Sequence, residues 1–445
     1  MIRTALLFLV LGGVARAGEP DFHETPRVAS GHTIEVLRGD SLKAIVAAAR
    51  PGDVIELHSG TYSAPGGLAF RRSGTPDAWI VLRGARGTMP TIDLAGGELA
   101  VSASYVCLES LEVVNGTGNN IHVVPRDMGT PLSCVVIRSV RSAEMGRGTG
   151  AALKIAGLWR NGAGAPCERV YVEGCELAGS RDNALVDAVG VRRSVVRSSW
   201  LHDPVNLSMK SPGIFFKGGS SEILIEKNLV SGIHGNAAIM VGGDTGAKWF
   251  DALHADPKLE GASEVVRNNI IADCDDAAVE LRGVQGARIL SNTIVVPSSF
   301  AIFRLTWGGA GSGSRIGNDD VEIANNLVVA TNRPRYVLNT GNEDARVRFG
   351  PQLWAGRFAP AEGSGVPRFP QERDVSAGSG SDVIADPRFE KLEGLADALG
   401  RFRPVRGSPA LGAAEPNVAA PRDALDAVRS RTPTIGALEP GSKRR

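Results

Sequence analysis

Short apolar strands separated by polar turns recur through the middle of the chain. Four similar strands follow one another at residues 213–217, 238–242, 278–282 and 301–305. Three of them are followed by a second strand that ends in asparagine, at 223–228, 265–269 and 288–292. A repeated unit of strand, turn and strand is typical of a solenoid, in which each coil packs only on its neighbours. The pattern predicts an all-β fold, a β-solenoid with parallel rungs.

One turn position can be aligned through eight repeats. Successive positions lie 23 to 41 residues apart, and the shortest steps match the length of one coil. The aligned positions are Leu111, Val140, Cys175, Ser199, Asn228, Asn269, Asn292 and Asn326. The longest step carries an insertion at about 244–261, and insertions of this kind tend to form loops on one face. Asparagine tolerates the left-handed backbone of tight turns, so the last four positions predict a structural ladder of stacked asparagines.

The two ends of the solenoid need covering, because an open end exposes apolar core and unpaired backbone. Residues 41–50 begin with a capping serine, show helical apolar spacing and stop at Pro51-Gly52, which predicts a short N-terminal helical cap. We expect residues 18–52 to form the lead-in and cap, and residues 53–330 the solenoid. Residues 331–445 should form loop-rich coils and an irregular C-terminal wrap over the open end.

The first residues have the layout of a secretory signal peptide. Arg3 precedes an apolar run at 5–14, and Ala15-Arg16-Ala17 offers a small-residue cleavage site. We therefore expect residues 1–17 to be removed near Ala17 and the protein to be secreted or periplasmic. Outside this run, no segment is long and apolar enough to predict a membrane span. We expect a monomer.

Charge and cysteine content narrow the function further. With 49 Lys and Arg against 48 Asp and Glu, the chain has no global attraction for nucleic acid, so any attraction for an anionic substrate must be local. Five cysteines are too few for a disulfide framework. Cys167 and Cys175 either pair across a turn or remain buried thiols.

Several motifs resemble those of secreted right-handed parallel β-helix proteins of the polysaccharide lyase type, a group that includes alginate lyases, chondroitinase B and pectate lyases. They lie at 51–57 (PGDVIEL) and 60–62 (GTY), in the asparagine-punctuated coils, and at 386–389 (DPRF), 408–410 (SPA) and 435–437 (IGA). The resemblance covers nearly the whole mature chain and implies a right-handed parallel β-helix that acts on an acidic polysaccharide. Lys210-Ser211 is similar to a Lys-Ser of the chondroitinase B type, but NLSM replaces the acidic residues expected before it.

Side chains of a strand alternate between two faces, so the strands of 213–306 predict which residues point outward. If Ile214 and Phe216 face the core, the outward residues are Phe215 and Lys217, Met240 and Gly242, Glu280 and Arg282, and Arg304 and Thr306. Rungs stack ~4.8 Å apart. Lys217, Glu280, Arg282 and Arg304 should therefore share a patch, with a hollow at Gly242. His122 and Lys154 are expected to continue the row.

This set of side chains suits β-elimination on a uronic-acid polymer. The reaction needs a cation at the sugar carboxylate, a base for the adjacent C–H and a proton donor for the leaving oxygen. We expect Lys217 to be the base, with Lys210 as its competitor and His234 as an alternative base or proton donor. Arg282 and Arg304 are the expected carboxylate clamps, because an arginine fork binds a carboxylate bidentately.

Two further groups are candidates for binding substrate and metal. Trp249 and Phe250, in the long insertion, either stack on a sugar ring or pin the loop, and Glu280 is expected to contact substrate. Asp244, Asp275 and Asp276 are the expected ligands of Ca²⁺, which prefers several oxygens. The structural alternatives are a cross-strand charge ladder for Glu280 with Arg304 and a turn pair for Asp275 with Asp276.

The sequence leaves three functions open. The favoured one is binding and cleavage of an acidic, uronic-acid-containing polysaccharide. The alternatives are a non-catalytic carbohydrate-binding or cell-surface protein, and a glycoside hydrolase, which needs two carboxyl groups facing one cleft.

Overall fold

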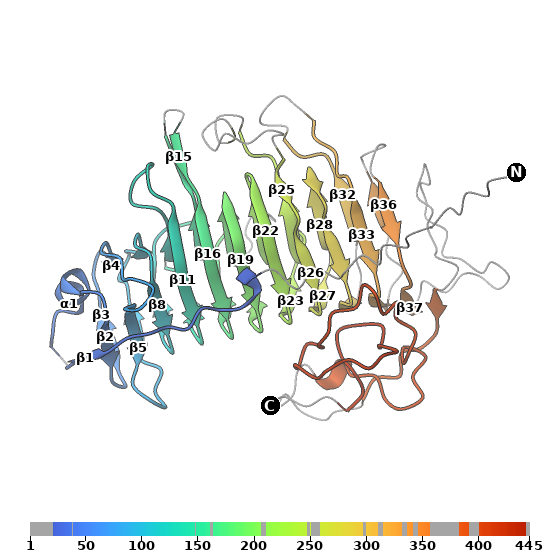
Figure 1. Ribbon diagram of the computed structural model, residues 1–445, viewed down its shortest axis with the longest axis horizontal. Helices are drawn as coiled ribbons and strands as arrows, with labels where there is room; N and C mark the ends of the chain where they lie inside the picture. Colours follow the sequence, from blue (N-terminus) through green and yellow to red (C-terminus); the bar gives the residue numbers. More distant parts are fainter. Residues whose placement is uncertain are drawn as a thin grey trace, which may run out of the picture.

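The chain winds into a ladder of parallel coils, as seen in a computed structural model (Figure 1). The structure describes residues 21–37, 39–146, 148–160, 163–205, 211–246, 250, 259–296, 300–309, 315–331, 336–340, 346–356, 382–390 and 400–441. In these ranges three long sheets, here called sheets A, B and C, run side by side along the coil axis with every strand parallel to its neighbours. This confirms the predicted parallel β-helix.

The strands follow one another coil by coil, each coil contributing to the sheets in turn. Sheet A contains β1 (His32–Val36), β2 (Asp53–Leu57), β5 (Ile80–Gly84), β8 (Val106–Glu109), β11 (Leu132–Arg138), β16 (Cys167–Glu173), β19 (Val191–Arg197), β22 (Ser220–Glu226), β25 (Gly261–Ala262), β26 (Val265–Arg267), β29 (Val284–Gln285), β30 (Arg288–Leu290), β33 (Val321–Ala324) and β36 (Val347–Phe349).

Sheet B contains β3 (Thr61–Ser63), β6 (Thr91–Asp93), β9 (Glu112–Val114), β12 (Arg141–Ser142), β17 (Glu176–Ala178), β20 (Trp200–His202), β23 (Leu229–Ile233), β27 (Ile270–Cys274), β31 (Thr293–Val296), β34 (Leu327–Ala330), β37 (Leu353–Gly356) and β38 (Val383–Ile384). Sheet C contains β4 (Leu68–Phe70), β7 (Leu99–Val101), β10 (Asn119–Val123), β13 (Ala151–Ala156), β18 (Val186–Val189), β21 (Ile214–Lys217), β24 (Ile239–Gly242), β28 (Ala277–Arg282), β32 (Ala301–Thr306) and β35 (Tyr336–Thr340). A separate antiparallel hairpin pairs β14 (Leu158–Arg160) with β15 (Ala163–Ala165).

The core is a set of columns of stacked aliphatic side chains. One column joins equivalent positions of sheet A on seven coils, all fully or almost fully buried: Ile137, Val172, Val196, Ile225, Val266, Ile289 and Ile323. Such a core grows along one axis, which is why a chain of 445 residues forms one long body here.

The predicted asparagine ladder is present. Asn228, Asn269 and Asn292 each donate a side-chain N–H to the side-chain oxygen of the next rung at 2.9–3.0 Å, and the ladder continues through Asn326 to Gln352. The left-handed turn residue is the one before each asparagine, such as Lys227 at φ 59°. The asparagine side chain therefore serves as an inward hydrogen-bonding group, because αL geometry is supplied by its neighbour.

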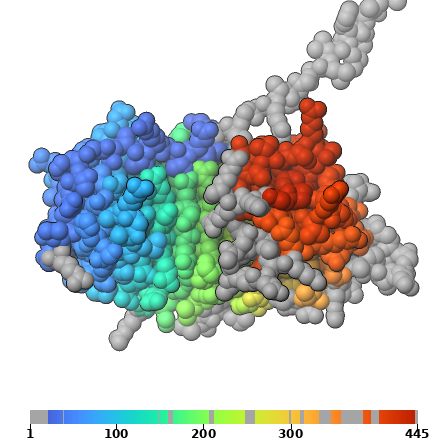
Figure 2. Space-filling view, turned by 90° about the horizontal axis from the view of Figure 1, so that it is seen from below, coloured from blue at the N-terminus to red at the C-terminus, as the bar shows by residue number. Residues whose placement is uncertain are grey.

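Both predicted end structures are found, with one change in the position of the wrap. Helix α1 (Leu42–Ala48) is capped by the Ser41 hydroxyl, which accepts from the N–H of Ala44 at 3.3 Å. The C-terminal segment, which includes η4 (Gly400–Phe402), lies along the outer face of sheet B beneath β23 to β37 instead of over the open end (Figures 1 and 2). The coils themselves begin at β1 and reach β38, so they extend beyond 53–330 at both ends.

A strap at the N-terminus covers part of sheet A. It begins with η1 (Asp21–His23) and crosses the front of the strands (Figure 1). Phe22 is buried against an outward apolar stripe that includes Val195 and Leu224. The predicted signal peptide lies outside the described residues.

The remaining expectations concern cysteines and membranes. All five thiols are free and four are buried. Cys167 and Cys175 are therefore buried thiols, the second of the two alternatives. Among the described helices, none has the length and apolarity required to cross a bilayer.

Candidate functional site

The outer face of sheet C carries a row of chemically active side chains. Strand pairing brings the outward residues of successive coils into one line: His122, Lys154, Asp187, Phe215, Met240, Glu280 and Arg304. Two positions further along the strands, Arg282 lies between Gly242 and Thr306, and Lys217 pairs with Val189. The predicted outward register and the extension to His122 and Lys154 are confirmed.

Lys217 is held against an aromatic ring at one end of this row. Its ammonium nitrogen lies 4.1 Å from the centre of the Phe215 ring and 3.8 Å from Oδ1 of Asp187. Its side chain keeps 27 % of its exposure. Burial lowers the pKa of Lys217, the carboxylate of Asp187 opposes that change, and the positive charge of Lys154 lowers the pKa further. A lysine whose pKa is lowered in this way is suited to act as a base.

Asp187 is a functional candidate that the sequence reasoning missed. Its side chain is buried, one oxygen binds the ammonium of Lys154, and Oδ1 has no hydrogen-bond partner among the described residues. An unsatisfied buried carboxylate oxygen is costly unless another group donates to it. The sequence signal for Asp187 is an acidic residue within the otherwise apolar strand VDAV. The alternation of side chains places it on the outer face of sheet C.

Two glycines pack closely against the strands next to Lys217. Gly242 has φ +80°, and a Cβ there would lie 1.9 Å from the carbonyl oxygen of Arg282, so the backbones approach too closely for any side chain. A Cβ on Gly243 would lie 3.3 Å from Cβ of Lys217. Glycine is required here by close backbone packing, which does not bear out the hollow predicted at Gly242.

The two predicted clamps are both paired with acidic side chains. Arg304 binds Asp276 through two hydrogen bonds of 2.9 and 2.7 Å and also donates to Glu280. Arg282 donates to Asp244 at 2.5 Å and has Nε 3.8 Å from Glu280. Arg304 is the more buried of the two, so Arg282 is better placed to exchange its partner for a ligand carboxylate.

A cavity of about 300 Å³ opens on this face; Phe215, which packs against Lys217, lines it, but Lys217 itself does not. It has an apolar side and a charged side, and its lining is Pro212, Phe215, Gly235, Asn236, Met240, Asp276, Glu280, Arg282 and Arg304. Such a cavity suits a sugar ring with a charged substituent, because apolar and polar faces occur together in that ligand.

The expected calcium ligands are not grouped. Asp244 binds Arg282, Asp276 binds Arg304, and Asp275 accepts from the N–H of Gly235 at 2.6 Å. In the ranges that the structure describes, no three acidic, histidine or cysteine side chains come together as a metal site. These carboxylates therefore do not fit a calcium site as they are arranged here.

The other predicted residues divide into three cases. His234 is 53 % exposed on a turn, lies 3.4 Å from Asp275 and does not line the cavity. Phe250 is fully buried, which matches the loop-pinning alternative. Lys210 and Trp249 lie outside the described residues.

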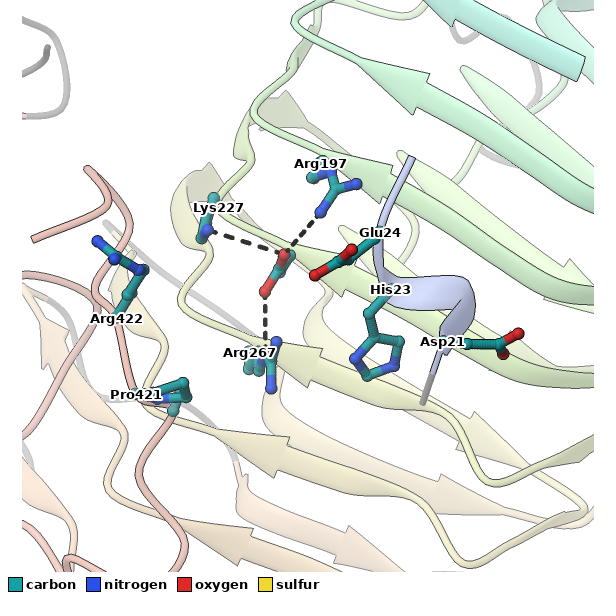
Figure 3. A pocket seen from close by; sticks show the side chains of 10 residues that line it. Asp21, His23, Glu24, Arg197, Lys227, Arg267, Pro421 and Arg422 are labelled. Atoms are coloured by element: carbon teal, nitrogen blue, oxygen red, sulfur yellow. Dashed lines mark hydrogen bonds and ion pairs between the residues drawn. The ribbon is translucent and has the colours of Figure 1, made fainter. Parts of the chain in front are cut away.

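A second pocket, of about 420 Å³, lies on sheet A between the N-terminal strap and the C-terminal segment (Figure 3). Arg197, Lys227 and Arg267 all point at the carboxylate of Glu226, which is 4 % exposed. Glu226 is the second-last member of a column of alternating glutamate and arginine that runs from Glu56 to Arg267. These charges satisfy one another, so the pocket is best explained as a structural junction.

Comparison with known proteins supports the fold. No protein-family model matches the sequence, and no curated protein matches it significantly. Among solved structures, pectate lyase Pel9A is similar at a TM-score of 0.55 and 13 % identity, over 93 % of this chain and 98 % of that one.

Two further solved structures are similar at lower scores. An alginate lyase from Paenibacillus sp. str. FPU-7 gives a TM-score of 0.42 at 18 % identity, over 73 % of this chain and 94 % of that one. The PL6 family polysaccharide lyase Pedsa3628 from Pseudopedobacter saltans gives 0.46 at 12 %, over 84 % and 99 %. The similarity to Pel9A shows that the chain shares the fold of that protein.

Proposed function

We propose that the outer face of sheet C binds an acidic, uronic-acid-containing polysaccharide and cleaves it by β-elimination. The observation that carries the proposal is Lys217, a lysine whose pKa burial lowers and whose ammonium nitrogen lies 4.1 Å from the centre of the Phe215 ring, which lines the charged cavity. The fold is shared with pectate lyase Pel9A, an enzyme of this reaction class by its name.

Two of the three groups that the reaction needs, the cation and the base, have a candidate on this face, and water supplies the proton that the leaving oxygen takes up. Arg282 would exchange Asp244 for the substrate carboxylate, which acidifies the neighbouring C–H. Lys217, in its neutral form, would take that proton. Phe215 and Met240 would support the apolar face of the sugar ring, since both line the cavity. Arg304 has a positioning role, because it holds Asp276 and Glu280.

The rival functions make different use of the same face. A hydrolase needs two carboxyl groups that face one cleft, and Asp276 and Glu280 do line the cavity, but they share one guanidinium. A non-catalytic binding protein needs only the row of side chains on sheet C to contact the polysaccharide, without a base. We further propose that the protein is exported after cleavage near Ala17 and acts as a monomer.

The test is a screen of the mature protein against alginate, pectate and chondroitin sulfate. Elimination produces unsaturated products that absorb in the ultraviolet, whereas hydrolysis produces new reducing ends without that absorbance. A protein that binds a polymer and yields neither signal would be a binding protein, and the proposed cleavage would be refuted.

A further inference from the structure

The acidic residues of sheet C are joined by two arginines into one network. In order of contact it reads Asp244, Arg282, Glu280, Arg304 and Asp276. Three carboxylates and two guanidiniums give a net charge of −1. Glu280 and Arg304 are largely buried, so this network is shielded from water more than a surface ion pair is.

One nitrogen of Arg304 occupies the centre of the acidic part. Nη2 donates to Oδ2 of Asp276 at 2.7 Å and also donates to Oε2 of Glu280. Because both oxygens bind the same atom, they can be no more than roughly 6 Å apart. Two oxygens on opposite sides of a calcium ion are about 5 Å apart, since Ca²⁺ binds oxygen at about 2.3–2.6 Å.

The remaining oxygens of these carboxylates are also engaged by the chain. Nη1 of Arg304 donates to Oδ1 of Asp276 at 2.9 Å, and the Thr306 hydroxyl lies 3.3 Å from Oε1 of Glu280. A calcium ion needs six to eight oxygen ligands. It could bind here only by displacing the guanidinium, which would then be buried beside a divalent cation.

We propose that Arg304 occupies, as a built-in cation, the position at which Asp276 and Glu280 would otherwise bind a divalent metal ion. The face therefore works without calcium, a consequence that rests on the proposed function. The proposal that Arg304 fills the metal position does not rest on that function, because it concerns only the binding of the calcium ion.

The experiment is calorimetric titration of the mature protein with CaCl₂ after treatment with EDTA. The wild type should show no saturable binding that depends on Asp276. Arg304→Met keeps an apolar stem of similar length and frees the two carboxylates, so it should gain one saturable Ca²⁺ site, about tenfold or more tighter than any in the wild type. Calcium should then raise its unfolding temperature.

The matched control is Arg282→Met, which removes the same charge from the same network but leaves Arg304 in place. It should gain no calcium site. A second check is Arg304→Met with Glu280→Gln, which should lose the gained site because one of the two carboxylates is gone.

Two results would overturn the inference. One is equal calcium binding by the Arg304→Met and Arg282→Met proteins. The other is a calcium site in the wild type that Asp276→Asn abolishes, and this measurement decides the matter even if Arg304→Met does not fold. A wild type that binds no calcium and shows no lyase activity would refute the proposed function while leaving the occupancy intact.

Discussion

The ammonium nitrogen of Lys217 lies 3.8 Å from Oδ1 of Asp187, an oxygen that has no hydrogen-bond partner among the described residues. The other oxygen of Asp187 binds Lys154. One buried carboxylate thus lies between two lysines on adjacent coils, and only one of the lysines is hydrogen-bonded to it. Lys217 is therefore the lysine that no hydrogen bond holds to this carboxylate.

The first prediction concerns the pH dependence of cleavage. Lys217 acts as a base only when neutral, so the rate should rise with pH through its pKa, which burial lowers below 10.5. Asp187 and Glu260 raise this pKa, and Lys154 lowers it. Asp187→Asn should move the alkaline rise of kcat to lower pH, and Lys154→Met should move it to higher pH.

The control for these profiles is Lys43→Met, which removes a lysine from α1 far along the chain from the row. Its pH profile should match that of the wild type. Equal shifts in the same direction for Asp187→Asn and Lys154→Met would show that Lys217 is not the titrating base.

The second prediction separates the two arginines. Arg304→Ala leaves the buried carboxylate of Glu280 without its guanidinium, which should destabilise the protein by about 3–5 kcal/mol. Arg282→Ala removes a more exposed pair and should cost less than about 1 kcal/mol.

Urea unfolding in EDTA measures both free energies of unfolding. Turnover of the polysaccharide should nevertheless be abolished in Arg282→Ala, because the clamp for the substrate carboxylate is gone. Full activity in that variant would remove Arg282 from the mechanism.

The third prediction tests the junction on sheet A. In Glu226→Gln, Arg197 keeps Glu173 and Lys227 keeps Asp426, but the buried negative charge that joins them to Arg267 is lost. The free energy of unfolding should fall by about 1–3 kcal/mol. Added salt should restore part of it, because ions screen the repulsion between the cations.

The matched control is Glu222→Gln. Glu222 pairs with Arg193 at an exposed position on the same strand, so the change should cost no more than about 1 kcal/mol. If the two substitutions have the same effect, the cations at Glu226 are hydrated and the pocket is not a junction.

The fold was predictable because its signals repeat. The turn asparagines recur at one position of each coil, and the alternation of strands such as IFFK fixes which side chains point outward. The sequence also contains a signal that the outer face of sheet B is covered. The adjacent apolar pairs Leu229-Val230 and Ile270-Ile271 point to opposite faces of sheet B, which shows that both faces are buried and that something covers the outer one.

The site was only partly predictable, since its partners depend on three-dimensional contacts. Sequence reasoning placed Lys217, Arg282 and Arg304 on one face, and strand pairing confirms this. It did not show that Asp276 would bind Arg304, because that bond spans 28 residues and depends on the length of the connecting coil. The position of Asp187 between Lys154 and Lys217 was missed for the same reason, because these residues are also far apart in the sequence.

The most direct test of the account is the ultraviolet absorbance of products formed from polyuronates by the wild type and by Lys217→Ala, with thermal unfolding measured on both. The account predicts absorbing products from the wild type, none from Lys217→Ala, and nearly equal unfolding temperatures. Undiminished formation of absorbing products by a folded Lys217→Ala protein would contradict it.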